Sequence, residues 1–240
     1  MAGVSVLGGL GRWIVAAMLL LTAGVAAAQV QVKQLAPGFA GVSAADTVLV
    51  MPLDVELFSL SAGGVAEPRA DWTAAARQHM AAALEQRTRA LGLTMQMGTE
   101  DLADEFAEQV GLQAAVAGSI ALHHGVGGIW ALPTKDGRLN WTFGDAMAPL
   151  AAKSGARYGL FFWVRDSYAS AERKAAMVAL AIMGIGITGG IQIGYASLVD
   201  LKTGQVVWFN HLARGTGDLR EPEPAKETIT SLLTGLPPAR

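Results

Sequence analysis

Cysteine is absent from this chain of 240 residues. Its absence excludes disulfide bonds, thiolate metal ligands, cysteine nucleophiles and lipidation of a cysteine side chain. Charge is also scarce, because only 16% of the residues are charged, and 18 basic and 20 acidic side chains leave a net charge of −2. Without a basic surface, nucleic acid is not an expected partner. Hydrophobic residues make up 52% of the chain, which is high for a soluble domain.

The first 28 residues have the three parts of a secretory signal peptide. Arg12 is their single charge, an uninterrupted apolar stretch follows it, and residues 26–28 are small, as signal peptidase requires. We therefore expect residues 1–28 to be a signal peptide and the mature protein to be periplasmic or secreted. An uncleaved anchor is the alternative, because the uncharged run 13–32 is long enough to span a bilayer. Since no cysteine follows this run, a lipoprotein is not expected.

Hydrophobic periodicity predicts the order of the elements in the remaining chain. After an extended leader at 29–45, the predicted elements are a strand at 47–57 interrupted at Pro52, a helix at 71–92 capped by Asp71, a strand at 93–97, helical pieces at 99–124 capped by Thr99, a long connection at 125–144, a helix at 145–154, a buried strand at 158–164, a hairpin at 191–210 turning at Gly204, and a helix at 222–235.

This order predicts one α/β (or α+β) domain over residues 46–236. We expect a mixed sheet of about five strands flanked by helices, with a carboxyl-terminal β-hairpin and helix. An apolar insertion at 175–190 is expected to interrupt the domain.

The hairpin sequence DLKTGQVVW, residues 200–208, carries a family resemblance. It is similar to the closing hairpin of envelope proteins that include the curli secretion-channel lipoprotein, the activator lipoproteins of penicillin-binding proteins and the amino-terminal domain of TolB. It also resembles the blade signature of quinoprotein-type propellers. A propeller needs several copies of that signature, and this chain has one. The envelope resemblance implies a non-catalytic assembly or accessory role, although the missing lipidation cysteine departs from the lipoprotein members.

A polar cluster follows the apolar strand 158–164, at the strand end where α/β sheets place ligand sites. Its structural interpretation is a solvated strand end with a local ion pair. A hydrolase that uses Ser167 with His211 and Asp218 is a further interpretation, although these three residue types occur together in most chains. The candidate binding residues are Arg165, Asp166, Ser167 and Tyr168, together with Arg214 after the final strand.

No other motif predicts a cofactor, a metal or a catalytic residue. The glycines at 184, 186 and 189 have nucleotide-loop spacing but follow a helix and precede a strand, the reverse of a dinucleotide site. The adjacent His123 and His124 diverge by about 100° on a helix, and no further ligand stands near them. We expect them to face carbonyls at a helix end.

The span 175–199 contains no charged residue and includes the apolar segment 175–190. Three interpretations stay open for this segment: a buried core helix followed by a glycine-rich loop, a transmembrane helix, or an apolar flap that meets a membrane or another subunit. The residues that would form such an interface or membrane segment are Met177, Leu180, Ile182, Met183, Ile185 and Ile187.

These observations predict a non-catalytic periplasmic accessory or scaffold protein in cell-envelope assembly. It would act through an envelope protein that the sequence does not identify, or through self-association, with Trp130 and Trp141 as further candidate anchors. One alternative is a membrane-associated oligomer that makes peripheral membrane contact through residues 175–190. The other is a hydrolase with a polar site at 165–168.

Overall fold

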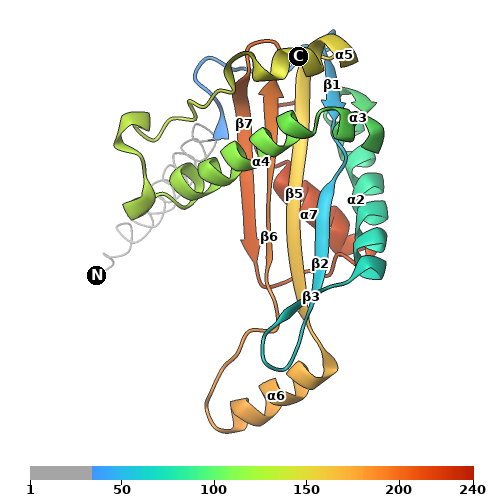
Figure 1. Ribbon diagram of the computed structural model, residues 1–240, viewed down its shortest axis with the longest axis vertical. Coiled ribbons are helices and arrows are strands. Elements are labelled where there is room, and N and C mark those ends of the chain that lie inside the picture. The colour runs from blue at the N-terminus through green and yellow to red at the C-terminus, as the bar shows by residue number, and fades with distance from the viewer. Residues whose placement is uncertain (1–33) are drawn as a thin grey trace, which may run out of the picture.

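The computed structural model describes residues 34–240, so the expected signal peptide lies outside the described residues (Figure 1). The described chain forms one mixed sheet flanked by helices on both faces, and the predicted α/β class is confirmed. The strands are β1 (Thr47–Val50), β2 (Asp54–Leu60), β3 (Ala66–Pro68), β4 (Thr94–Met97), β5 (Tyr158–Ala169), β6 (Gln192–Asp200) and β7 (Gln205–Arg214). The helices are α2 (Ala70–Ala90), α3 (Glu100–Glu105), α4 (Ala107–Ile120), α5 (Ala148–Ser154), α6 (Ala171–Ile182) and α7 (Pro222–Leu232).

The central strand β5 has neighbours on both sides. Along one side β6 pairs antiparallel with residues 158–166 of β5. Along the other side β1 pairs in parallel with residues 158–160 and β2 pairs in parallel with residues 163–169. The chain break predicted at Pro52 is confirmed, because β1 and β2 lie end to end along the same side of β5. Each then has its own outer neighbour, β4 for β1 and β3 for β2.

Two hydrophobic cores lie on opposite faces of the sheet. Successive side chains of a strand point to opposite faces, so Leu160, Phe162 and Val164 of β5 pack with α2 and α7. Phe161 and Trp163 pack on the other face, with residues of α4 and α5. Figure 1 shows α4 in front of the strands and α7 behind them, with α2 beside the sheet.

Several local predictions agree with the structure. Thr99 accepts a hydrogen bond from the amide of Leu102 and caps α3, and the predicted helical pieces are α3 and α4. They meet at Phe106, whereas Gly111 and Gly118, where the low helix propensity of glycine suggests a break, lie inside α4. Asp71, by contrast, does not cap α2: it lies in the first turn, where it pairs with Arg69 at 2.9 Å. The short strand β3 was not expected, because its three residues Ala-Glu-Pro are exposed and carry no apolar pattern.

Both ends of the described chain pack against the domain. The amide of Ala36 donates to the carbonyl of Val207, and Val42 and Ala44 exchange backbone hydrogen bonds with Arg240. The described part of the segment 29–45 therefore belongs to the folded unit.

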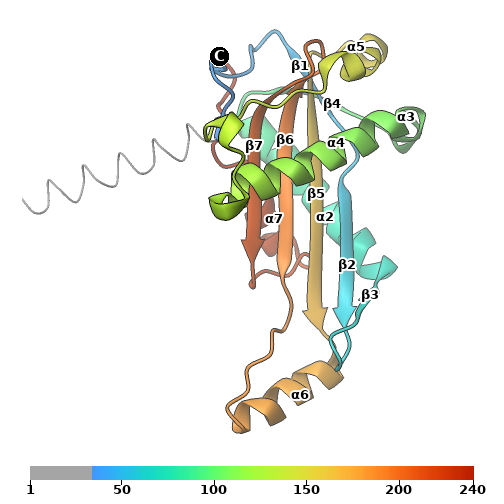
Figure 2. The ribbon, with the colours of Figure 1, turned by 60° about the vertical axis from the view of Figure 1, so that its left-hand side comes forward.

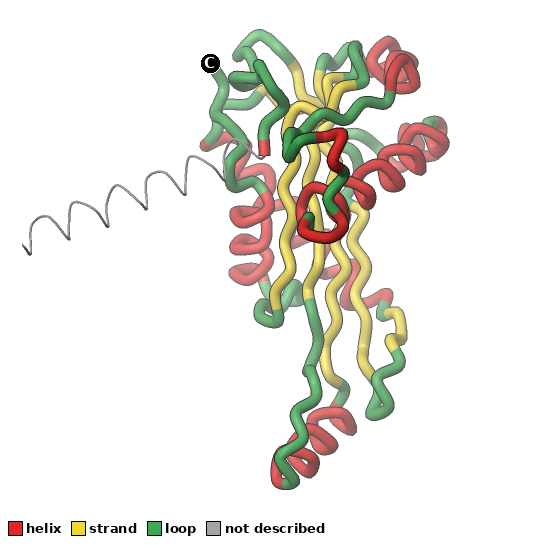
Figure 3. The backbone as a smooth tube through the Cα atoms, turned by 90° about the vertical axis from the view of Figure 1, so that its left-hand side faces the viewer, coloured by secondary structure: helices red, strands yellow, loops and turns green. Residues whose placement is uncertain are grey.

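One end of the sheet projects beyond the helices that cover the cores. The ribbon and the tube show α6 at the far end of the longest axis, joined to β5 and β6 (Figures 2 and 3). Ser170 caps α6 by accepting a hydrogen bond from the amide of Arg173. We call residues 171–191, which comprise α6 and the chain that returns from it to β6, the apolar flap.

The turn between β6 and β7 explains the hairpin signature in structural terms. The Asp200 side chain accepts hydrogen bonds from the amides of Lys202 and Thr203, and its carbonyl accepts one from Gly204. As predicted, Gly204 has a positive φ, of 69°. Its carbonyl accepts a hydrogen bond from Phe143, so the turn also holds the chain that enters α5.

Replacing Gly204 by alanine should destabilise the protein more than replacing Gly155 by alanine. Both glycines have a φ of 69°, so each substitution carries the strain of a left-handed alanine, about 1–2 kcal/mol. Only at Gly204 would the new Cβ lie 2.0 Å from a backbone oxygen, that of Gly144, whereas nothing lies within 4 Å at Gly155. Urea unfolding of both variants measures the difference, and equal losses would contradict this account of the turn.

Candidate functional site

Four residues of the predicted polar cluster, Arg165 to Tyr168, lie within the second half of β5 rather than after the strand, and strand alternation divides them between the two faces of the sheet. The fifth, Arg214, is the last residue of β7. Arg165 lies on the face of α4, where its guanidinium contacts Asp54 at 2.7 Å and Glu56 at 3.3 Å. The same guanidinium lies 4.8 Å from the centre of the Trp163 ring. Arg165 is therefore paired at the surface and separated from Asp166 by the sheet.

Asp166 and Tyr168 lie on the opposite face. The Asp166 side chain is 3% exposed. One carboxyl oxygen accepts hydrogen bonds from the Tyr168 hydroxyl and from the Gln192 amide, both at 2.5 Å, and the other accepts one from the amide of Ser167 at 2.8 Å. The Tyr168 oxygen in turn accepts a hydrogen bond from the amide of Leu219 at 2.7 Å.

Gln192 connects this carboxyl to Arg214. Its side-chain oxygen accepts hydrogen bonds from Arg214 Nε at 2.8 Å and from the Thr228 hydroxyl at 3.0 Å. Three of the five residues expected to form the cluster, Asp166, Tyr168 and Arg214, thus belong to one buried network. Gln192 and Thr228 were missed, because the register of β6 and the docking of α7 bring them there and neither is a local feature of the sequence.

The electrostatics of the network are those of a buried carboxyl. Burial raises the pKa of Asp166 to about 6, against the opposing effect of the hydrogen bonds from Tyr168 and Gln192. Burial, followed by the hydrogen bond to Asp166, raises the pKa of Tyr168. The hydrogen bond from Arg220 lowers the pKa of Asp218 nearby, and the Arg220 guanidinium lies 4.4 Å from the centre of the Tyr168 ring. The polar side chains of this network are occupied by one another, as in a structural support.

Ser167, His211 and Asp218 do not form a triad. The Ser167 hydroxyl donates to the carbonyl of Ile191 at 3.1 Å and accepts from its amide at 3.0 Å. His211 pairs with Tyr195, four residues beyond Ile191. At about 3.3 Å per residue, some 13 Å of strand separate Ser167 from His211, so the hydrolase interpretation has no serine–histidine pair.

The surroundings of His123 and His211 are those of structural side chains. Nδ1 of His123 lies 2.7 Å from the carbonyl oxygen of Trp130, just beyond the helical turn Ala121–Val126, in keeping with the expected contact to a carbonyl at a helix end. Burial, and then the charge of His124, lowers the pKa of His211. Within residues 34–240, no three histidine or acidic side chains come together as a metal site would need.

The apolar flap lies outside both cores. Ile182 is 83% exposed, Met183 66% and Ile185 50%, and Val178 is exposed beside them. The interpretation of this segment as a buried core helix is therefore wrong. In the described part of the chain, no helix combines the length and hydrophobicity needed to cross a bilayer. The other expected interface residues are half-buried: Met177, Leu180 and Ile187.

Arg173 fixes the base of the flap. Its side chain is buried, and its guanidinium donates to the carbonyl of Thr188 at 2.9 Å and to the carbonyl of Ser61 at 3.4 Å. These bonds tie the first turn of α6 to the returning chain and to the turn that follows β2. The exposed apolar side chains are thus held in place by a buried polar anchor.

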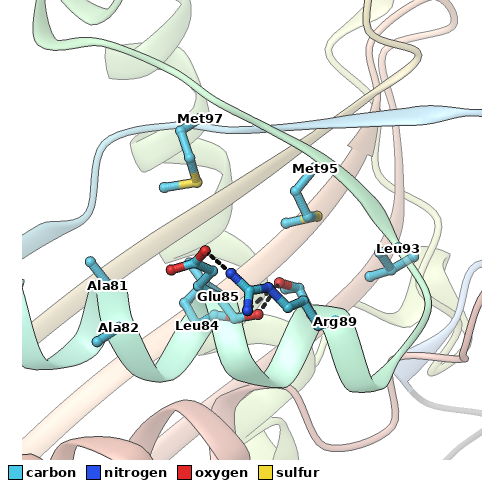
Figure 4. A pocket seen from close by; sticks show the side chains of 9 residues that line it. Ala81, Ala82, Leu84, Glu85, Arg89, Leu93, Met95 and Met97 are labelled. Carbon is cyan, nitrogen blue, oxygen red and sulfur yellow. Dashed lines mark hydrogen bonds and ion pairs between the residues drawn. The ribbon is translucent and has the colours of Figure 1, made fainter.

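Two further apolar features stand on the surface. Val126, Ile129 and Trp130 are exposed on the connection before α5, while Trp141 is half-buried beneath the Lys135 ammonium group. The second feature is a groove of about 540 Å³ between α2 and β4. We call it the α2–β4 groove (Figure 4), and the apolar residues that line it are Ala81, Ala82, Leu84, Leu93, Met95 and Met97.

Comparison with known proteins gives similarity only to solved structures. No family model matches the chain, and no curated protein matches it either. A PelC dodecamer from Paraburkholderia phytofirmans is 17% identical, with a TM-score of 0.40 over 83% of this chain and 92% of that one. Lipoprotein GNA1162 from Neisseria meningitidis is 15% identical, with a TM-score of 0.30 over 70% and 79% of the two chains.

The LpoB C-terminal domain from Salmonella enterica is 14% identical, with a TM-score of 0.29 over 75% of this chain and 87% of that domain. All three are likenesses at low identity, so the function of this chain has to be inferred from its own residues.

Asp166 should make stability depend on pH between 4 and 6. Its pKa is 3.8 in the unfolded chain and about 6 in the folded protein, so the folded state binds this proton more tightly. The resulting stabilisation is complete below pH 3.8 and is lost as pH rises through 6; at 1.36 kcal/mol per pKa unit it amounts to about 3 kcal/mol. Urea unfolding at a series of pH values should show this loss in the native protein and a flatter profile in Asp166→Asn.

Asp218→Asn is the matched control. The pKa of Asp218 is lowered by Arg220, so its stabilisation is lost on acidification, and its removal should change the pH profile in the opposite sense. Identical pH profiles for the native protein and Asp166→Asn would show that the carboxyl of Asp166 is not the titrating group.

Proposed function

We propose that this chain is a non-catalytic accessory or scaffold protein of the bacterial cell envelope. It is exported to the periplasm and acts through protein contacts made by the apolar flap. The observation that carries this proposal is the exposure of Val178, Ile182, Met183 and Ile185 on one projecting element. Single exposed apolar residues are common, whereas a cluster of them usually marks an interaction surface.

The energetics favour a partner for the flap. Covering one large aliphatic side chain is worth about 1.5–3 kcal/mol relative to leaving it in water. Several such side chains lie within residues 178–185, and no charged residue between 175 and 199 would have to be desolvated with them. The anchor formed by Arg173 reduces the entropy cost of binding, because the flap is held before the partner arrives.

The polar cluster supports a non-catalytic role. The polar side chains in this network are already hydrogen-bonded within the protein. Asp166 accepts from Tyr168 and Gln192, and Arg214 donates to Gln192. A catalytic base needs a free path to a substrate proton, and the Asp166 carboxyl faces internal donors instead.

A membrane-associated oligomer is the second candidate. The observation that favours it is the uncharged span 175–199, because a segment without charge enters the interfacial region of a bilayer without a large desolvation cost. α6 has 12 residues, so it would lie on the membrane rather than cross it.

Replacing Ile182 and Met183 together by serine should remove the interaction and leave the fold intact. Both side chains are largely exposed, so we expect the free energy of unfolding to change by less than about 0.5 kcal/mol. Sedimentation velocity and in-cell cross-linking of the native protein and the variant measure association. Val126→Ser with Ile129→Ser is the control, because it removes two exposed apolar side chains elsewhere.

Fractionation separates the two candidate functions. For the protein-contact function, we expect the mature protein to leave the membrane fraction after washing with high salt and carbonate. Retention after both washes, abolished by the serine pair at 182 and 183, would favour the membrane-associated oligomer. A serine pair that unfolds the protein would show that these side chains support the fold, against the proposed role.

A further inference from the structure

The outer edge of β4 is open to another strand. In the described sheet β4 pairs only with β1, so the backbone groups on its other side have no strand partner. Leu93, Met95 and Met97 alternate along this edge and point toward α2, where they line the α2–β4 groove (Figure 4). Met97 is 56% exposed. A strand added beside β4 would extend both the backbone ladder and the apolar lining.

The groove carries no unbalanced charge. Glu85 and Arg89, one turn apart on α2, are the charged residues of its lining, and they form an ion pair with each other. The remaining lining residues are apolar, apart from Thr88, whose hydroxyl donates to the carbonyl of Leu84. An uncharged segment therefore suits this groove better than a charged one.

The returning chain of the apolar flap has the matching properties. Residues 185–191 form neither helix nor strand, and Gly186 and Ile187 make no hydrogen bond within residues 34–240. Ile185 and Ile187 are two residues apart, so both would point to the same side of an extended chain. The glycine between them presents no side chain on the opposite side. The Ile185 amide donates to the carbonyl of Leu180, and Ile191 is bonded to Ser167. Between them, Gly186 and Ile187 form a short uncharged backbone without hydrogen bonds, and Ile185 and Ile187 flank it with apolar side chains at strand spacing.

The two surfaces cannot meet within one molecule. Figure 2 shows β4 near one end of the longest axis and α6 at the other. We therefore propose that residues 185–187 of one copy add as a strand to the free edge of β4 in a second copy, with Ile185 entering the α2–β4 groove. This proposal rests on the proposed function of the flap as a protein-contact surface, and it names a second copy of this chain as the partner.

This contact would be heterologous, because two different surfaces meet. Each copy then keeps a free flap at one end and a free groove at the other, so the contact repeats until a ring closes or a filament grows. Backbone hydrogen bonds along β4 would supply affinity, and the groove would select side chains of the size of isoleucine, as in other strand additions.

The absence of cysteine in this chain permits a direct test. Ile185→Cys and Met97→Cys each replace a side chain that is at least half exposed, so both variants should keep the native melting temperature. The two purified single variants are mixed and exposed to a mild oxidant. We expect a disulfide-linked species of twice the monomer mass from the mixture and little or none from either variant alone. Ile129→Cys mixed with Met97→Cys is the control pair and should not cross-link.

Four outcomes would overturn this inference. Cross-linking of Ile185→Cys with itself would show that flaps meet each other. An absence of cross-linking in a sample that still oligomerises would show that a different surface joins the copies. If the serine pair at 182 and 183 abolishes association while the mixed cysteines do not link, the proposed function stands. Only the assignment of the α2–β4 groove as the binding site of the flap is then wrong. A flap variant that changes nothing contradicts both proposals.

Discussion

The length of β5 is the constraint on which the rest of the structure depends. This strand runs for 12 residues, and its first half is buried between two helical layers. Its last residues, from Arg165 to Ala169, continue past the layer of α4. Because β2 and β6 both pair with this distal part, the sheet carries the apolar flap away from the body of the protein. The flap is exposed because β5, which supports it, extends beyond the helices that cover the rest of the sheet.

The buried network around Asp166 stands at the base of this projection. Its carboxyl joins the end of β5 to the first residue of β6 through Gln192, and Arg214 and Thr228 add β7 and α7 to the same amide. Ser167 and Ile191 close the base with a further pair of hydrogen bonds. The buried polar network around Asp166 thus connects the end of β5 to the start of β6, the two strands between which the apolar flap lies.

Local sequence signals predicted much of the fold. The break at Pro52, the cap at Thr99 and the turn at Gly204 depend on neighbours in the chain, and all three agree with the structure. Strand alternation alone could have separated Arg165 from Asp166, because adjacent residues of a strand face opposite sides. The partnership with Gln192 and Thr228 could not be predicted, since strand register and helix docking are set by contacts distant in sequence. Composition likewise identifies residues 175–190 as apolar, but it does not predict whether they are buried or exposed.

The central claim is that the apolar flap contacts protein. The most direct measurement is site-specific photo-cross-linking in living cells from a probe at position 182, with a probe at position 126 as the comparison. The account predicts a discrete protein adduct from position 182 that disappears when Met183 and Ile185 are replaced by serine. Adducts formed only with lipid, or none above the level at position 126, would contradict it.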